Sequence, residues 1–159
     1  MTPAEFLRRI YELESDLACK EDEIRKIHED MTHLKSVDTS HDRVDGGKPL
    51  DLSDKVAHLI EVETLLDQEW DELIRWREEA RRLIDMLEPG LSKGVLMLRV
   101  VNHRSWKKVA AVIHKSEDYC RHLYPLAVGD FEQLLATRFP DYLDTVEIKT
   151  FNITRKNQA

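Results

Sequence analysis

Apolar residues recur at alternating spacings of four and three through the first part of the chain. They are Phe6, Ile10, Leu13, Leu17, Ile24, Ile27, Met31 and Leu34. This heptad pattern is typical of a helix that buries one narrow stripe against a partner helix. Thr2 and Pro3 mark its start, because Thr caps a helix N-terminus and Pro fits the first helical position. We therefore predict a long coiled-coil helix at the N-terminus.

A second heptad pattern runs from about Leu50 to Leu87. Its apolar members are Leu52, Val56, Leu59, Leu66, Trp70, Leu73, Ala80, Ile84 and Leu87, with Glu63 and Arg77 as interruptions. The segment between the two patterns, Ser36–Pro49, contains Gly46 and Gly47 and is predicted to be a loop. The loop allows the helices to fold back on each other, so residues 1–88 are predicted to form a long antiparallel helical hairpin.

The register of this hairpin follows from pairing Leu34 with Leu52. In that register Lys20, which interrupts the first pattern, lies beside Glu63. A single polar pair in an apolar seam can specify the register of two helices. We therefore predict that Lys20 and Glu63 form a partly buried ion pair.

A second, smaller group of helices is predicted over residues 91–139. Glu88-Pro89-Gly90 stops the hairpin, and Leu91–Val101 follows as a short helix. Ser105 and Ser116 are natural N-caps for two further helices, the second covering residues 116–127. Pro125 should end or kink that helix, and a last helix is expected over Phe131–Phe139. Residues 140–159 form a tail whose TVEIKTFNI stretch alternates like a strand.

The two Ser-capped helices have the pattern of a helix-turn-helix. Trp106, Val109, Ala110 and Ile113 share one face of the first helix, while Cys120, Leu123 and Ala127 share one face of the second. A small residue, Ala110, stands where the helices must approach each other. Any compact helical corner shares these features, so this pattern alone leaves both alternatives open.

The stretch from Leu91 to Val128 resembles the fourth-region helix-turn-helix of sigma factors, and more closely the C-terminal part of small phage regulators of the ArpU/RinA type. The residues that carry this resemblance are Leu96, Leu98, Arg99, Ser105, Trp106, Val109, Ala110, Ile113, Ser116, Glu117, Arg121 and Leu123. The resemblance implies a DNA-binding regulator of phage or prophage genes, often late ones. The chain departs from the family at Asp118 and His122, where basic residues are usual, and at Pro125.

Charge is distributed unevenly along the chain. The net charge is −7, yet Leu91–Val128 holds seven Lys and Arg against two Asp and Glu, whereas residues 1–90 hold 13 against 24. A basic motif beside an acidic arm is expected of a protein that reads double-stranded DNA and has a separate protein-facing surface. RNA polymerase is a possible partner of the arm. Because operators of such regulators are often paired half-sites, we expect a homo-oligomer, in the simplest case a dimer.

The predicted DNA contacts divide into two groups. Backbone phosphates would be held by Arg104, Ser105, Lys107, Lys108, Lys115 and Ser116. Base edges would face the first turns of the second helix, at Glu117, Asp118, Tyr119, Arg121 and His122. Arg121 is the best candidate for a bidentate contact to guanine, while Glu117 or Asp118 could accept a hydrogen bond from cytosine.

Several functions are not expected. The sequence offers no nucleophile with a histidine partner, so we predict no enzyme, no catalytic residue, no cofactor and no small-molecule substrate. His28, His33 and His41 lack the spacing and companions of a metal site, and no apolar run is long enough to cross a membrane. Two dispersed cysteines and the absence of a signal peptide favour the cytoplasm of a bacterial host.

Two alternatives remain open at this point. One is a phage DNA-packaging protein of the terminase small-subunit kind, which would assemble as a ring of many copies. The other is a protein-interaction module that binds its partner through the acidic hairpin and binds DNA negligibly.

Overall fold

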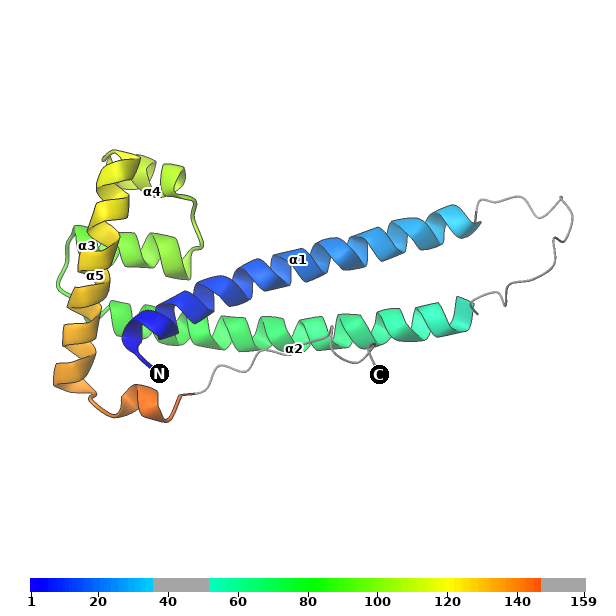
Figure 1. Ribbon diagram of the computed structural model, residues 1–159, viewed down its shortest axis with the longest axis horizontal. Coiled ribbons are helices and arrows are strands. Elements are labelled where there is room, and N and C mark those ends of the chain that lie inside the picture. The colour runs from blue at the N-terminus through cyan, green and yellow to red at the C-terminus, as the bar shows by residue number, and fades with distance from the viewer. Residues whose placement is uncertain (36–51, 147–159) are drawn as a thin grey trace, which may run out of the picture. The chain divides into compact units, whose positions relative to one another are not determined.

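The computed structural model describes residues 1–35 and 52–146 and is all-helical over them, which confirms the predicted all-α class (Figure 1). Its elements are α1 (Pro3–Lys35), α2 (Leu52–Ile84), α3 (Leu91–Leu96), the π-helical turn η1 (Met97–Val101), α4 (Trp106–Ile113), α5 (Glu117–Arg138) and the 3-10 turn η2 (Tyr142–Asp144). The predicted loop, His41 and most of the predicted strand in the tail lie outside the described residues. No helix in the described ranges has the length and apolarity needed to span a bilayer.

The described residues form two compact units. The first unit comprises residues 1–15 and 71–146, and the second comprises residues 16–35 and 52–70. Both long helices are therefore shared between the units, whereas the sequence suggested a boundary at residues 88–91. The reason is that the first turns of α1 and the last turns of α2 make contacts with residues 99–103, as described below.

Polar side-chain contacts join α1 to α2 in the second unit. Lys20 Nζ lies 2.5 Å from Glu69 Oε2, Trp70 Nε1 donates to Glu21 Oε1 at 2.9 Å, and His28 Nε2 lies 2.9 Å from Glu63 Oε1. Lys20 and Glu21 contact Glu69 and Trp70, whereas His28, two turns later on α1, contacts Glu63, which lies earlier on α2, so the two segments run in opposite directions here. Lys20 is thus paired with Glu69, not with Glu63 as predicted.

The partner of Lys20 differs from the prediction because α2 buries a different stripe. Leu59, Leu66, Leu73 and Ala80 are buried as expected, but the row between them is Val62, Glu69, Trp76 and Leu83. The predicted row was Glu63, Trp70, Arg77 and Ile84, of which Ile84 is buried as predicted. Burying the observed row removes one charged residue from water instead of two, and burial of an unpaired charge is costly. That one residue, Glu69, is fully buried and receives Lys20 as its counter-ion.

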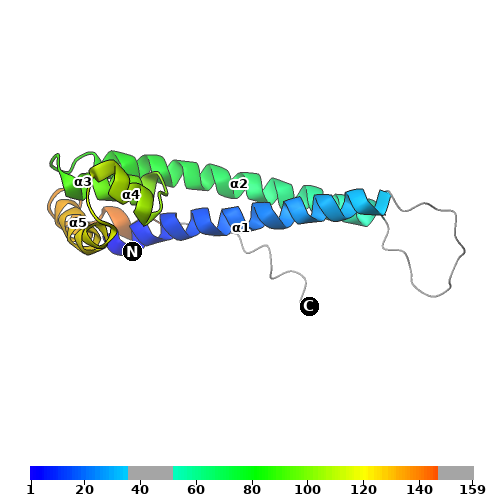
Figure 2. The ribbon, with the colours of Figure 1, turned by 90° about the horizontal axis from the view of Figure 1, so that it is seen from above.

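The first unit contains α3, η1, α4 and α5, with α5 packed against both α3 and α4 (Figures 1 and 2). The chain turns from α2 into α3 around Pro89 and Gly90, as the sequence predicted. The predicted helix Leu91–Val101 is present as α3 followed by η1. Its last turn widens, because the amide of Asn102 donates to the carbonyl of Met97, five residues back, at 3.0 Å.

Helix α5 differs most from the expectation. A break at Pro125 was predicted, with separate helices over residues 116–127 and Phe131–Phe139, but α5 runs without interruption from Glu117 to Arg138. Proline inside a helix costs about 3 kcal/mol, because it removes a hydrogen bond and crowds the preceding turn. Burial of Cys120, Ala127, Phe131 and Leu135 along one face, on both sides of Pro125, offsets that cost. Packing therefore overrides the local preference.

Candidate nucleic-acid interface

Two Ser-capped helices separated by three residues form the candidate interface. Ser105 Oγ accepts a hydrogen bond from the amide of Lys108 at the start of α4, and Ser116 Oγ accepts one from the amide of Tyr119 at the start of α5. Both N-caps were predicted and are confirmed. Between the helices, His114 adopts a left-handed conformation (φ 55°, ψ 45°) and ends α4. This conformation turns the chain sharply enough for Ser116 to begin the next helix.

A small apolar core holds these helices together. Its buried members are Val95, Val109, Ala110 and Cys120, and the partly buried residues packed against them are Leu98, Trp106, Ile113, Leu123 and Tyr124. Trp106 and Tyr124 meet edge to face, with ring centroids 5.6 Å apart. Both predicted inward faces contribute, and Ala110 stands within this core as expected. Of the two cysteines, Cys120 is buried and Cys19 is exposed.

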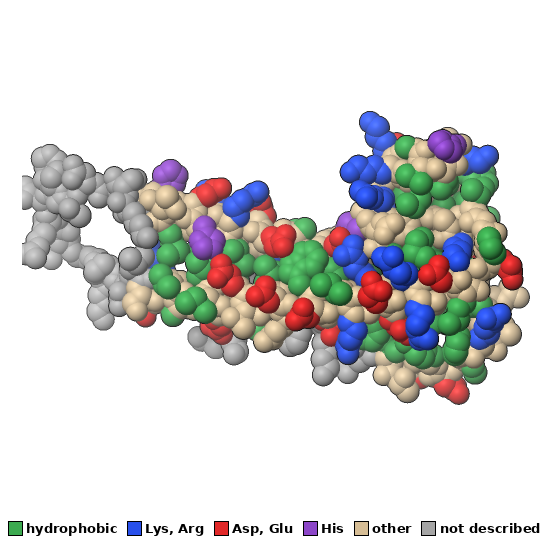
Figure 3. Space-filling view, turned by 180° about the vertical axis from the view of Figure 1, so that it is seen from behind, with side chains coloured by type: hydrophobic (Ala, Val, Ile, Leu, Met, Phe, Trp, Pro, Cys, Tyr) green, Lys and Arg blue, Asp and Glu red, His purple; other side chains and the backbone are tan. Residues whose placement is uncertain are grey.

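Four cations of this region have no carboxylate partner in the part of the chain that the structure describes. Arg104, Lys107, Lys108 and Lys115 are all exposed, and no carboxylate of the described residues lies within 4.0 Å of them. Lys115 Nζ lies 5.6 Å from the centroid of the exposed Tyr119 ring. Figure 3 shows Lys and Arg side chains interspersed with Asp and Glu over one face of the molecule. These four cations remain available to an external anion such as a phosphate.

The first turns of α5 carry all the predicted base-reading residues on an exposed surface. Arg121 already has two neighbours: Glu117, at 3.5 Å, and the ring of Trp106, whose centroid lies 5.8 Å from the guanidinium carbon. His122 Nδ1 lies 2.7 Å from the carbonyl oxygen of Asp118. The Arg121–Glu117 pair is about half exposed, so it contributes little stability and can be exchanged for a DNA contact.

Arg99 joins the candidate interface to α1. Its guanidinium carbon lies 4.3 Å from the centroid of the Tyr11 ring and 4.6 Å from that of Trp106, and it donates to the carbonyl of Arg104 at 2.8 Å. Arg99 is one of the seven Lys and Arg residues counted in Leu91–Val128, but its guanidinium is already engaged by these contacts. It therefore supports the position of Trp106 and the start of α4 and is not a free cation.

Glu14, Arg77 and His103 form a polar cluster close to Arg99 and Tyr11, and this cluster was not predicted from the sequence. Arg77 donates to the carbonyl of Val101 at 2.9 Å and lies 3.4 Å from Glu14, which also approaches His103. The His103 ring stacks on Tyr11 with centroids 4.2 Å apart. The available signal was Arg77 itself, because a charged residue that interrupts an apolar stripe requires a partner.

Residues 1–35 and 52–146 contain no group of three or more His, Cys, Asp or Glu side chains arranged to hold a metal ion. His28 and His33, considered above as ligands, belong to no such group.

Comparison with known families matches residues 33–126 to the family described as "Protein of unknown function (DUF1492)". The match covers more than half of the chain, which therefore belongs to this family. It includes α2, α3, η1, α4 and the first turns of α5. Comparisons with curated proteins and with solved structures gave no match.

Proposed function

We propose that the protein is a sequence-specific DNA-binding regulator of phage or prophage transcription, of late genes in particular. In this proposal α4 and α5 are the two helices of a helix-turn-helix, and residues 116–127, the N-cap and first turns of α5, enter the major groove. The exposed cations Arg104, Lys107, Lys108 and Lys115, which have no carboxylate partners among the described residues, are the observation that carries the proposal. They flank both helix N-termini, where free amides also favour phosphate.

The roles of the individual residues follow from their positions. Phosphate contacts by these cations would fix the orientation of the protein on the duplex without reading sequence. Arg121 would exchange Glu117 for the O6 and N7 acceptors of a guanine, and the freed Glu117 could accept from the amino group of a cytosine. Asp118 repels phosphates, so it would penalise a shifted binding register and favour specificity over affinity.

A second candidate function, protein interaction, is favoured by a different observation. Val56 and Ile60 lie one turn apart on α2 with 38% and 57% of their surface exposed, in the acidic part of the chain. Exposed apolar side chains among carboxylates suit a partner with a basic, partly apolar surface, and RNA polymerase is one such candidate. A regulator could use both surfaces, whereas a pure interaction module would use only this one.

The test is binding of the full chain to DNA fragments from its own genomic neighbourhood at two salt concentrations. Arg121→Ala is compared with Arg81→Ala, which removes an exposed arginine from α2. We expect selective binding that Arg121→Ala reduces by about tenfold or more and that Arg81→Ala leaves unchanged. Absence of binding at low salt would reject DNA recognition and leave protein interaction. A ring of many copies would instead favour a DNA-packaging protein.

A further inference from the structure

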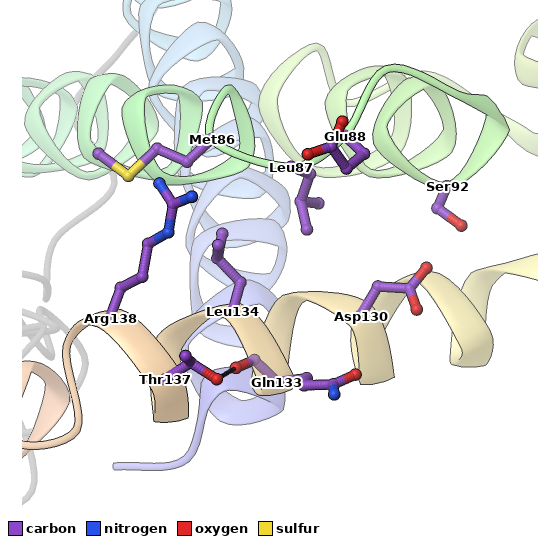
Figure 4. A pocket seen from close by; sticks show the side chains of 9 residues that line it. All are labelled: Met86, Leu87, Glu88, Ser92, Asp130, Gln133, Leu134, Thr137 and Arg138. Atoms are coloured by element: carbon purple, nitrogen blue, oxygen red, sulfur yellow. Dashed lines mark hydrogen bonds between the residues drawn. The ribbon is translucent and has the colours of Figure 1, made fainter.

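A groove of about 410 Å³ lies between the C-terminal half of α5 and the connection from α2 to α3 (Figure 4). Its lining residues are Met86, Leu87, Glu88, Ser92, Asp130, Gln133, Leu134, Thr137 and Arg138. Arg138 reaches toward Met86 at one end, while Glu88 and Asp130 stand with Ser92 toward the other, and Leu87 and Leu134 lie between them. The groove thus has an apolar middle and ends of opposite charge.

The charges of this groove have no partners within the described chain. No ion pair among residues 1–35 and 52–146 involves Glu88, Asp130 or Arg138. Asp130, Leu134 and Arg138 follow one another at intervals of four residues on α5. Residues at this interval share one face of a helix, so Leu134 lies one turn from a negative residue and one turn from a positive one.

We propose that this groove is a self-association surface, and that its occupant is the same stretch of α5 from a second copy of the chain. A two-fold axis passing near Leu134 would set the two α5 segments antiparallel. Because Asp130 and Arg138 are equally far from Leu134 in sequence, Arg138 of each copy then faces Asp130 of the other. Leu134 of each copy enters the apolar middle of the groove of the other, near Leu87.

Charge complementarity is the reason for choosing a second copy as the occupant. An interface with two-fold symmetry must be complementary to itself, and a leucine between opposite charges at equal spacing meets that condition. Glu88 lies at the acidic end and adds a second acceptor for the incoming Arg138. The apolar middle supplies water-excluded contact, while the two ion pairs select the antiparallel orientation.

The experiment measures the mass of the full chain by sedimentation equilibrium over a range of concentrations. The wild type is expected to reach twice the chain mass of 18.7 kDa. Asp130→Arg and Arg138→Asp each place like charges opposite one another twice per dimer, so each should weaken self-association by about tenfold or more. Both residues are exposed, and circular dichroism of each variant checks that α5 remains folded.

Mixing the two single variants is the decisive step. One variant then carries two positive residues on this face and the other two negative ones, so the mixture should associate as heterodimers with affinity close to that of the wild type. The double variant Asp130→Arg/Arg138→Asp should likewise self-associate. Glu132→Arg, an exposed charge reversal on another face of α5, should leave the mass unchanged.

Three results would overturn the proposal: a wild-type monomer at all concentrations, single variants that associate like the wild type, or weakened single variants that do not recover on mixing. An assembly larger than two copies would also overturn it, because a two-fold interface closes at the dimer. The proposal does not depend on DNA binding, and its test contains no DNA, so the two proposals can fail separately.

Discussion

His103 Nδ1 lies 3.3 Å from Glu14 Oε2, and neither atom makes a hydrogen bond with any described residue. The two residues connect the loop after η1 to the first turns of α1 within the first unit. His103 also has a positive φ of 48°, which is uncommon for a residue other than glycine. The contacts around this residue maintain a backbone conformation that the local sequence does not favour.

We predict a pH-dependent contribution of His103 to stability. Burial lowers the pKa of His103 below its usual 6.5; the Glu14 carboxylate opposes this shift, and Arg99 and Arg77 reinforce it. The unfolded chain therefore takes up a proton that the folded chain resists. The free energy of unfolding should decrease as the pH falls from about 6.5 toward the lower pKa of the folded state.

This is measured by urea unfolding at several pH values across that interval. In His103→Asn the decrease should be smaller than in the wild type, because asparagine does not titrate and tolerates a positive φ. His58→Asn, which removes an exposed histidine of α2, serves as the matched control and should leave His103's contribution intact. An unchanged pH dependence in His103→Asn would exclude His103 as the source.

Removing Lys20 alone from its ion pair with Glu69 should destabilise the second unit strongly. Lys20→Met would leave the fully buried Glu69 carboxylate without this cation, which typically costs about 3–5 kcal/mol. The double variant Lys20→Met/Glu69→Leu should recover most of that loss, since it removes the buried charge as well. Chemical denaturation measures the free energy of unfolding of the wild type and of both variants. His28→Ala breaks a pair that is about half exposed and should cost less than about 1 kcal/mol.

Replacing Pro125 should stabilise the protein. Because α5 is continuous through this position, Pro125→Ala restores a backbone donor inside a helix and should raise the free energy of unfolding by about 1–3 kcal/mol. Thermal unfolding followed by circular dichroism provides the measurement. Pro140→Ala, which lies beyond the end of α5, should have a much smaller effect. Equal effects of the two substitutions would contradict a continuous α5.

Lys107 and Lys108 should determine how steeply DNA binding depends on salt. If each contacts a phosphate, Lys107→Gln/Lys108→Gln should weaken binding to all fragments alike and reduce the slope of log affinity against log salt by about 2. Titrations of one selective and one random fragment at several salt concentrations test this. Lys55→Gln with Lys26→Gln is a charge-matched control outside the interface. A loss confined to the selective fragment would instead indicate base contacts.

The sequence predicted correctly those structural features, such as helix caps, that depend only on residues close together in the chain. Thr2 caps α1 in the structure by accepting from the amide of Glu5, and Ser105 and Ser116 cap their helices as expected. These predictions succeed because a cap is decided within one helical turn. The all-α class follows from periodicity over long stretches for a similar reason.

The errors concern interactions between distant residues. The stripe that α2 buries carries one charged residue, Glu69, where the predicted stripe carries two, and the counter-ion of Glu69 is Lys20, 49 residues away in the sequence. Continuity of α5 through Pro125 depends on burial of residues on both sides of it, and the group of Glu14, Arg77 and His103 combines three separate segments. Spacing along the chain gives no information on such contacts.

Because α5 is continuous, the angle about its axis between any two of its side chains is fixed. The proposed DNA-facing residues near Arg121 and the face that carries Leu134 are parts of one helix, so their relative direction is set by the number of residues between them. Inserting one residue between them would rotate one face against the other by about 100°, whereas inserting seven would nearly restore the original direction. Length variation in this stretch should therefore be tolerated mainly in whole heptads.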